Sequence, residues 1–311
     1  MRETVDFLLH DWLRVTELTT RPRFADHSAE TFTQVIDTCE RIAREKYAPF
    51  NRLVDTEEPR MVTDGDDVRV VLPRATHDAW AAYADSGMLA AAQDHEVGGM
   101  QLPYTVEAAA DAFFAKASVS IGGGLLTRGN ASLLMAHGTE AQKRVFAATE
   151  FSGRWSGTMC LSEPQAGSSL SDITTRAEPD GDEFERDPLG PRYRLRGHKM
   201  WISAGEHELT ENIVHLVLAK IPREDGTLVP GTRGISLFIV PKKMVDADGR
   251  LTGERNDVVL AGLNHKCGWR GTTNTLLNFG EGRFRPLGRG GAVGWLVGRP
   301  GEGLRCMFHM M

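Results

Sequence analysis

The chain has 311 residues, 41% of them hydrophobic and 25% charged, with a net charge of −6 when histidine is neutral. This composition excludes a disordered or collagen-like chain and leaves room for two domains with a sizeable core. The charge argues against a nucleic-acid partner, and no apolar run reaches the ~20 residues of a membrane helix. Four widely spaced cysteines and an N-terminus unlike a signal or transit peptide predict a reduced, cytoplasmic protein.

Residues 1–152 are predicted to form a helical domain. Between Thr31 and Ala43 apolar residues recur every three or four positions, the spacing of one buried helix face. Ser28 precedes this run as a candidate N-cap, and Pro49 follows it. The same spacing predicts further helices over 78–87, 104–118 and 125–137, and another that begins near residue 139.

Beyond residue 152 the sequence changes to short runs that alternate or are rich in β-branched residues. These runs cover Tyr193–Lys199, Ile213–Ala219 and Gly234–Val240, and Asp-Gly turns separate them. Strands of this length and spacing predict a small antiparallel β-barrel-like domain over 153–287. Residues 288–311 are Gly-rich and then helical in pattern, and are assigned to the start of a C-terminal helical domain. The predicted fold class is therefore α+β, with an all-α helical domain followed by a small antiparallel β-barrel-like domain.

Two further sequence signals do not predict a ligand site. His207 and Glu208 begin the zinc pattern His-Glu-x-x-His, but Glu211 stands where the second histidine is required. His207 is therefore interpreted as a hydrogen-bonded or surface histidine, and no metal site is predicted. The glycines at 122–124 follow a helix rather than a strand, so a turn between helices is favoured over a phosphate cradle.

Two segments of the predicted β-domain carry groups suited to a flat cofactor. Met159–Ser169 (MCLSEPQAGSS) begins as a strand and ends in a loop rich in backbone N–H and hydroxyl donors. Lys199–Ser203 (KMWIS) is a strand in which alternation places Trp201 and Ser203 on one face, roughly 7 Å apart. Taken alone, the first is better explained as a turn at a strand end and the second as a core tryptophan beside a capping serine. Together they favour one site, because hairpin-like sequence lies between them.

At these motifs the sequence resembles the acyl-CoA dehydrogenase family of flavoproteins. MCLSEPQAGSS is similar to the family's strand-loop, and KMWIS is similar to the strand that follows it. Further stretches agree in order along nearly the whole chain: DHEVGGMQLP, HGTEAQK, TRGISLFIVP and NHKCGWRGT. GEHELTENIVHLVLAK and GAVGWLVG resemble the long branch that includes dehydrogenases of 3-methylmercaptopropionyl-CoA.

The resemblance implies FAD bound against the β-domain, with an acyl-CoA thioester between the flavin and a catalytic carboxylate. It assigns flavin-ring contacts to Leu161–Ser162 and pyrophosphate contacts to Gly167–Ser168. It also implies that Trp201 packs against the isoalloxazine and that Ser203 hydrogen-bonds near N5, the atom that receives the hydride. The implied reaction is α,β-dehydrogenation to an enoyl-CoA, with electrons passing to an electron-transferring flavoprotein.

The chain departs from the family where relatives carry the general base and part of the adenine site, because residues 288–311 only begin that helical domain. Glu163 is expected to be structural and nothing marks Glu206 as a base, so no catalytic residue is assigned. The apolar residues of Met307–Met311 are expected to be exposed.

The chain alone is therefore expected to be inactive and to be completed in a homo-oligomer or by a partner chain. The alternative is a non-catalytic flavin-binding subunit that a partner chain completes. A third possibility, a DNA-associated relative of the family, is disfavoured by the net charge of −6.

Overall fold

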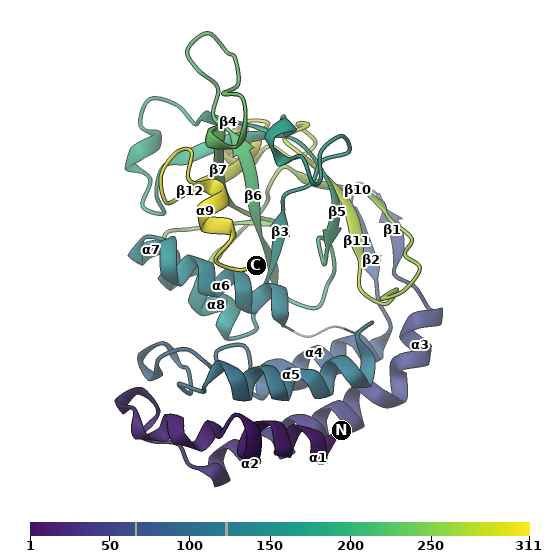
Figure 1. Cartoon of the computed structure of the whole chain (residues 1–311). Coiled ribbons are helices and arrows are strands. Elements are labelled where there is room, and N and C mark those ends of the chain that lie inside the picture. Colours follow the sequence, from purple (N-terminus) through teal and green to yellow (C-terminus); the bar gives the residue numbers. More distant parts are fainter. Residues whose placement is uncertain (66, 122–123) are drawn as a thin grey trace. The chain divides into compact units, whose positions relative to one another are not determined.

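The computed structural model describes residues 1–65, 67–121 and 124–311 (Figure 1). The chain divides into two compact units, each of which is described by itself. The first comprises Met1–Glu58, Pro73–Leu125 and Gly268–Gly271, and the second comprises Pro59–Leu72, Leu126–Cys267 and Thr272–Met311. The predicted turn at 122–124 falls largely on residues 122–123, outside the described residues.

The first unit is helical, and its helices begin and end where local signals predict. Ser28 caps α2: its Oγ accepts the N–H of Thr31 at 3.3 Å, while Thr31 Oγ1 accepts the N–H of Ser28 at 2.8 Å. Buried Phe32 and Ile36 form the core face of α2, along which α5 packs (Figure 1). The helices are α1 (Arg2–Asp6), α2 (Ala29–Ile42), α3 (Asn51–Thr56), α4 (Arg74–Asp85) and α5 (Tyr104–Ser118).

Residues 1–152 are not all helical, which corrects the sequence prediction. β1 (Arg60–Asp64) and β2 (Asp67–Val71) form an antiparallel hairpin, with Gly65 at φ 59° in the turn. Val70 is buried among the core residues of the second unit, and Val68 packs against the same core. This alternation of apolar residues was a strand signal, because side chains two apart on a strand share a face.

The helices α6 (Leu125–His137), α7 (Glu140–Gln142) and α8 (Ala148–Phe151) follow, and from residue 126 onward they belong to the second unit. The buried Nδ2 of Asn130 donates to the carbonyls of Thr158 at 3.2 Å and Val214 at 3.0 Å, which ties α6 to two strands. The packing units therefore change at 125/126, whereas the domain boundaries at 152/153 and 287/288 stay predictions. No helix among the described residues has the length and apolar character needed to cross a membrane.

Five strands of the second unit close into a ring in the order β5, β12, β7, β6 and β4, because β4 pairs with both β5 and β6. β3 extends the sheet beside β6, and β11 and β10 extend it from β5. The strands are β3 (Trp155–Cys160), β4 (Arg176–Pro179), β5 (Arg192–Ser203), β6 (Asn212–Lys220), β7 (Ile235–Pro241), β8 (Lys243–Val245), β9 (Leu251–Arg255), β10 (Val258–Leu263), β11 (Asn274–Phe279) and β12 (Ala292–Val297).

The mixed helix-and-strand class is confirmed, but the sheet is not wholly antiparallel. β3 runs parallel to β6 over six residue pairs, and β4 meets β6 in the same sense. The chain reaches β6 from β3 only after β4 and β5, and a long crossover of this kind allows parallel neighbours. The prediction of an antiparallel barrel is therefore wrong at these two pairings.

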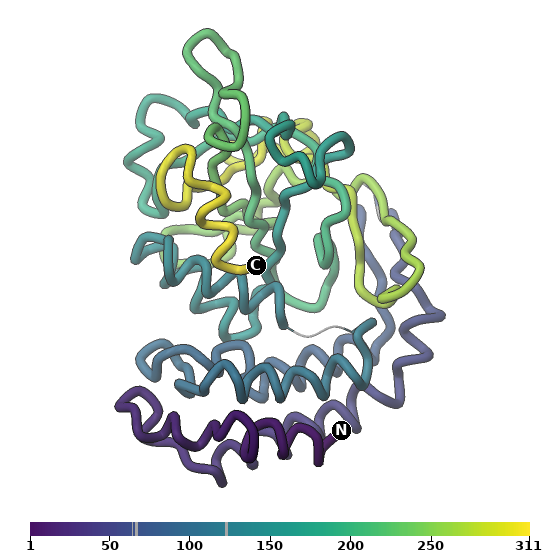
Figure 2. The backbone as a smooth tube through the Cα atoms, in the orientation of Figure 1, coloured from purple at the N-terminus to yellow at the C-terminus, as the bar shows by residue number. Residues whose placement is uncertain are grey.

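β12 was not predicted, because its glycines obscured a fully buried strand between β5 and β7. A Cβ at Gly294 would lie 2.8 Å from Leu195 Cδ1, so close packing requires the glycine. α9 (Gly303–Met307) then packs on β7, and the chain continues to Met310, which lies against Gly129 of α6 (Figure 2). Met307 is fully buried, which corrects the expectation that it is exposed, whereas Phe308 is 62% exposed.

Candidate cofactor-binding site

The two motifs singled out in the sequence lie side by side in the second unit. The N–H of Met200 donates to the carbonyl of Ser162 at 3.0 Å. Nζ of Lys199 donates to the carbonyl of Leu161 at 2.9 Å. These two bonds join the loop after β3 to the two residues of β5 that directly precede Trp201. The structure therefore brings Leu161–Ser162 next to the segment that carries Trp201.

Strand β5 is irregular at Trp201. Between the residue pairs Lys199–Leu277 and Ile202–Thr275, β5 has two intervening residues and β11 has one, which is a β-bulge. Trp201 has a φ of 64°, a left-handed conformation that is unfavourable for a side chain with a Cβ, and it is 57% exposed. Trp201 is therefore not a core tryptophan, and strained, exposed residues of this kind cluster at functional sites.

Ser203 follows on the same stretch of β5. Ile202 is buried, whereas Ser203 is half-buried and Trp201 is exposed. This alternation agrees with a shared face for Trp201 and Ser203. The bulge breaks the alternation one step earlier, because Lys199 and Ile202 are both buried although three residues apart.

Two backbone hydrogen bonds within the loop after Ser162 fix its turn, and several other donors of the loop have no partner in the described part of the chain. The N–H of Glu163 donates to the carbonyl of Ala166 at 2.7 Å, and the N–H of Ala166 donates back at 3.0 Å. Gly167 has no left-handed φ, and an added Cβ there would meet no atom within 4 Å, so neither backbone nor packing requires the glycine. Among the described residues, the backbone N–H groups of Gly167 and Ser168 and the hydroxyl groups of Ser162, Ser168 and Ser203 have no hydrogen-bond partner.

Glu163 lies beneath this loop as a buried anion. Its Oε1 accepts from Lys199 Nζ at 2.9 Å and from the N–H and Oγ1 of Thr175 at 3.0 and 2.6 Å. Its Oε2 accepts from the N–H and Oγ1 of Thr174 at 2.8 and 3.0 Å and from Gln165 Nε2 at 2.8 Å. Burial alone would raise the pKa of Glu163, but the Lys199 charge and these hydrogen bonds outweigh it and lower the pKa to about 2. Such a carboxylate is a poor proton acceptor, so Glu163 is structural.

Glu206, the other carboxylate considered as a base, is also held in an ion cluster. Its side chain is 4% exposed and pairs with Lys242 Nζ, and its Oε2 lies 3.9 Å from Arg255. Burial raises the pKa of Glu206, and the charges of Lys242 and Arg255 offset this only in part. Neither glutamate is a free carboxylate beside the exposed indole.

Histidine does not build a metal centre in the described part of the chain, where no group of three or more potential ligands is present. His207 is buried and its Nε2 lies 3.2 Å from Ser156 Oγ, as the interpretation of a hydrogen-bonded histidine predicts. His215 is likewise buried, with Nδ1 2.8 Å from Thr158 Oγ1.

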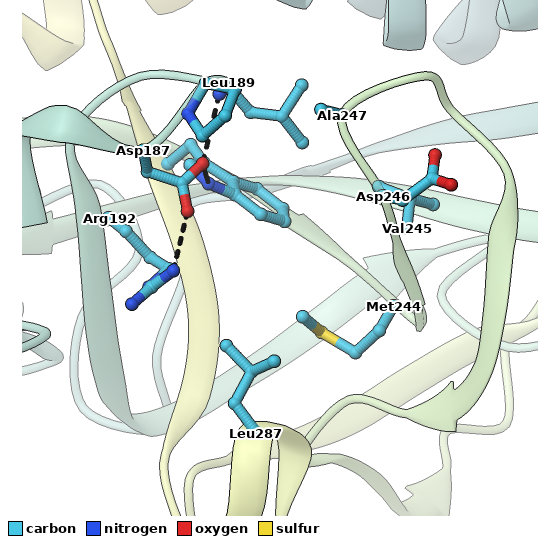
Figure 3. Close-up of a pocket in the computed structure, with 10 residues that line it drawn as sticks. Asp187, Leu189, Arg192, Met244, Val245, Asp246, Ala247 and Leu287 are labelled. Atoms are coloured by element: carbon cyan, nitrogen blue, oxygen red, sulfur yellow. Dashed lines mark hydrogen bonds and ion pairs between the residues drawn. The ribbon is translucent and has the colours of Figure 1, made fainter.

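A cavity of about 170 Å³ also lies in the second unit, but none of the candidate residues lines it (Figure 3). Its charged lining residues are Asp187, Arg192 and Asp246. Asp187 accepts from Trp295 Nε1 at 2.9 Å and from Arg192 at 2.6 Å, and Asp246 Oδ1 accepts from the N–H groups of Asp248 and Arg250. The rest of the wall is largely apolar, with Leu189, Met244 and Leu287 among its residues. The cavity is therefore separate from the candidate cofactor residues.

Comparison with known proteins agrees with the motifs. Residues 29–153 match the acyl-CoA dehydrogenase N-terminal domain, and residues 158–279 match the acyl-CoA dehydrogenase middle domain. The 3-methylmercaptopropionyl-CoA dehydrogenase of Ruegeria pomeroyi is 36% identical over 304 residues, which cover 97% of this chain and 47% of the relative. The chain belongs to the acyl-CoA dehydrogenase family.

Other acyl-CoA dehydrogenases show the same partial coverage. A butyryl-CoA dehydrogenase of Syntrophomonas wolfei is 31% identical over 99% of this chain and 48% of its own length. The solved structure of an acyl-CoA dehydrogenase complexed with FAD from Bacillus anthracis has a TM-score of 0.64 and 20% identity, over 92% of this chain and 41% of that one. The chain thus spans about half the length of the curated relatives it matches.

All of the candidate cofactor residues lie within the matched middle domain. Sequence reasoning missed Lys199 and Met200, whose bonds join the two motifs. The sequence did not signal the buried position of Lys199, because it lies two residues before Trp201 and strand alternation places both residues on one face. The partners of that lysine could not be deduced, because they depend on the register of β5 against the loop after β3.

Proposed function

We propose that this chain provides the FAD-binding face of an acyl-CoA dehydrogenase, which converts an acyl-CoA to an enoyl-CoA. The observation that carries the proposal is the junction at which Met200 binds the Ser162 carbonyl while the neighbouring Trp201 is exposed on left-handed backbone. Family membership and the acyl-CoA substrates in the relatives' names support the reaction class.

The residues present fit FAD in their chemistry. A flat ring system needs an apolar surface and hydrogen-bond donors at its edge, which the indole of Trp201 and the groups of Leu161, Ser162 and Ser203 offer. A pyrophosphate needs N–H donors that it can approach closely, which the open backbone at Gly167–Ser168 offers. When bound, FAD supplies the acceptor for the β-hydride.

Each residue then has a defined task. Trp201 packs on the ring and excludes water from one side, and the Ser203 hydroxyl donates near the ring position N5. The Leu161–Ser162 backbone and the Ser162 hydroxyl bind the polar edge of the ring, and Gly167–Ser168 bind the pyrophosphate. These are binding and orienting roles, because the charged side chains nearby are committed to structural pairs.

We propose that the acceptor of the α-proton and the remaining adenine contacts come from the portion of the relatives that this chain does not span. A polypeptide segment that carries this portion, in the same protein or in a partner chain, would supply them, and electrons would leave to an electron-transferring flavoprotein. The engagement of both Glu163 and Glu206 also supports a second candidate, a flavin-binding subunit without activity of its own. The two candidates are separated by adding acyl-CoA to the FAD-loaded chain while the portion of a relative that the chain does not span is supplied in trans. Bleaching of the flavin supports the enzyme, and an unbleached flavin supports the subunit without activity.

The test of the site is FAD titration of the purified chain, followed by fluorescence, with Trp201→Ala compared with Trp12→Ala. Both remove an exposed tryptophan, since Trp12 is 69% exposed. Loss of stacking predicts that W201A weakens FAD binding about tenfold or more, whereas W12A leaves it unchanged. Absence of FAD binding by the folded chain, or equal affinities of the two variants, would contradict the proposal.

A further inference from the structure

We infer that Lys199 and Glu163 form a positioning pair that fixes the Leu161–Ser162 backbone and turns the Ser162 N–H toward the bound cofactor. This inference rests on the proposed function for the identity of the ligand, and it adds residues to that function which touch no cofactor themselves.

The first step is the placement of the lysine. The Lys199 side chain is 0% exposed, an arrangement that lysine adopts only when its charge is paired. Its Nζ bridges two acceptors, the Leu161 carbonyl at 2.9 Å and Glu163 Oε1 at 2.9 Å. The ammonium group is therefore a fixed donor beneath the loop, because both of its protein acceptors lie in that loop.

The second step is the anchoring of the glutamate. Besides Lys199, the Glu163 carboxylate accepts bonds from Gln165 and from the backbone and hydroxyl groups of Thr174 and Thr175. These donors come from the turn of the loop and from the segment that leads into β4. A carboxylate held from so many directions cannot shift, so it holds Lys199 in place beneath the Leu161 carbonyl.

The third step is the peptide unit that joins Leu161 to Ser162. In a planar trans peptide the C=O and the N–H point in opposite directions. The Leu161 carbonyl points to the buried Lys199 Nζ, so the N–H of Ser162 points away from the core. This N–H has no protein acceptor among the described residues. The next peptide unit is fixed at both of its polar groups, because the Ser162 carbonyl accepts from the N–H of Met200 and the Glu163 N–H donates to the carbonyl of Ala166.

The ligand that suits this arrangement is a ring edge with hydrogen-bond acceptor atoms, such as that of a flavin. The pair acts through the backbone and contributes no side-chain atom to the ligand.

The second buried lysine–glutamate pair offers a matched control. Lys242 Nζ also bridges a carboxylate, that of Glu206, and a backbone carbonyl, that of His207 at 3.4 Å. Its lysine and glutamate side chains are 9% and 4% exposed. None of the backbone groups that it holds belongs to a candidate cofactor residue.

The experiment compares two neutral double variants, Lys199→Met with Glu163→Gln and Lys242→Met with Glu206→Gln. Amide hydrogen exchange over residues 161–169 is measured in the chain without FAD, and FAD affinity is measured by titration. In the first variant we expect exchange at Glu163 and Ala166, whose N–H groups are hydrogen-bonded within the loop, to accelerate at least tenfold and FAD to bind at least tenfold more weakly. In the control we expect both quantities to stay within about twofold of the parent chain.

A milder variant covers the case in which the first double variant does not fold. Thr175→Val removes only the hydroxyl donor 2.6 Å from Glu163 Oε1, and we expect a smaller change in the same direction. Exchange that is unchanged at residues 161–169, or accelerated equally by both double variants, would overturn the inference. So would faster exchange with unaltered FAD affinity. Failure of the parent chain to bind FAD would instead reject the proposed function, while the exchange comparison still tests the pair.

Discussion

The two buried lysine–glutamate pairs of the second unit have similar geometry, but the pKa values of their carboxylates are shifted in opposite directions. Glu163 and Glu206 are both at most 4% exposed in the side chain, and each contacts a lysine Nζ. Yet the pKa of Glu163 is lowered to about 2, because Lys199 and its hydrogen bonds outweigh burial, whereas burial keeps the pKa of Glu206 above its ordinary value.

The difference lies in the hydrogen-bond donors rather than in the cations. Thr174, Thr175 and Gln165 supply five donors to Glu163 in addition to Lys199. Glu206 has two cations, Lys242 and Arg255, but gains little from uncharged donors. Two cations therefore do not offset the effect of burial on the pKa of Glu206, whereas one cation together with converging N–H and O–H groups more than offsets it for Glu163.

The largest expected effect comes from removing each lysine alone. Lys199→Met leaves an ionised Glu163 without its cation, and we expect a loss of about 3–5 kcal/mol in the free energy of unfolding. Lys242→Met should cost less, because Glu206 can accept a proton at a smaller penalty. Urea unfolding at pH 7 measures both, and equal losses would break the comparison.

The pH dependence of stability separates the two glutamates next. The pKa of Glu163 falls from 4.5 to about 2 on folding, which corresponds to about 3 kcal/mol of stability. This contribution is present above pH 4.5 and is lost as the pH falls through about 2. Glu163→Gln should therefore remove most of the acid-induced loss in that range. Thermal unfolding midpoints between pH 2 and pH 5 measure it, and an unchanged acid slope would contradict the assignment.

Glu206 should act with the opposite sign. Its folded pKa is raised, so its contribution is present below the ordinary value of 4.5 and is lost as the pH rises. Glu206→Gln should then gain stability relative to the parent chain on going from pH 4 to pH 8. The same midpoints, extended to pH 8, test this, and parallel curves for E163Q and E206Q would remove the distinction.

Much of the fold was predictable where it depends on neighbours along the chain. α5 and α6 have the predicted ends, and Ser28 caps α2, because helix periodicity and capping are local. The parallel pairing of β3 with β6 and the insertion of β12 between β5 and β7 depend on partners far away in the sequence. Alternation identifies a strand but does not name its neighbour.

The candidate site was predictable to a similar degree. Alternation and the family resemblance together located Trp201 and Ser162, and the structure joins them through Met200. The left-handed backbone of Trp201 could not be predicted, because it arises from a bulge against β11. The role of Lys199 was hidden for the same reason, since a lysine in a strand usually faces solvent.

A third buried glutamate sharpens the comparison, because it has neither cation nor donors. Glu150 is 0% exposed, and among the described residues neither of its carboxylate oxygens has a hydrogen-bond partner. Burial raises the pKa of Glu150 well above 4.5. The contribution of Glu150 to the free energy of unfolding is therefore fully present below pH 4.5 and is lost as the pH rises.

Glu150→Gln should therefore gain on the parent chain by up to about 1.4 kcal/mol per pH unit above pH 4.5, until the folded pKa is reached. Urea unfolding at pH 5 and pH 7 measures the gain, with Glu140→Gln as an exposed helical control. A constant difference across pH would mean that Glu150 is ionised in the folded chain and has a partner.

The smallest expected effect concerns backbone strain beside each pair. Trp201 lies two residues after Lys199 with a φ of 64°, and Ala204 lies two residues before Glu206 with a φ of 54°. Glycine adopts a left-handed conformation at about 1 kcal/mol less cost than alanine does.

Without FAD, the free energy of unfolding of W201G should thus exceed that of W201A by about 1 kcal/mol, and A204G should gain a similar amount over the parent chain. Because neither W201G nor W201A has the indole, both should bind FAD equally weakly, whereas A204G keeps the parent affinity. Equal stability of W201G and W201A would show that the bulge accommodates the left-handed residue without strain, so that its exposure needs no functional explanation.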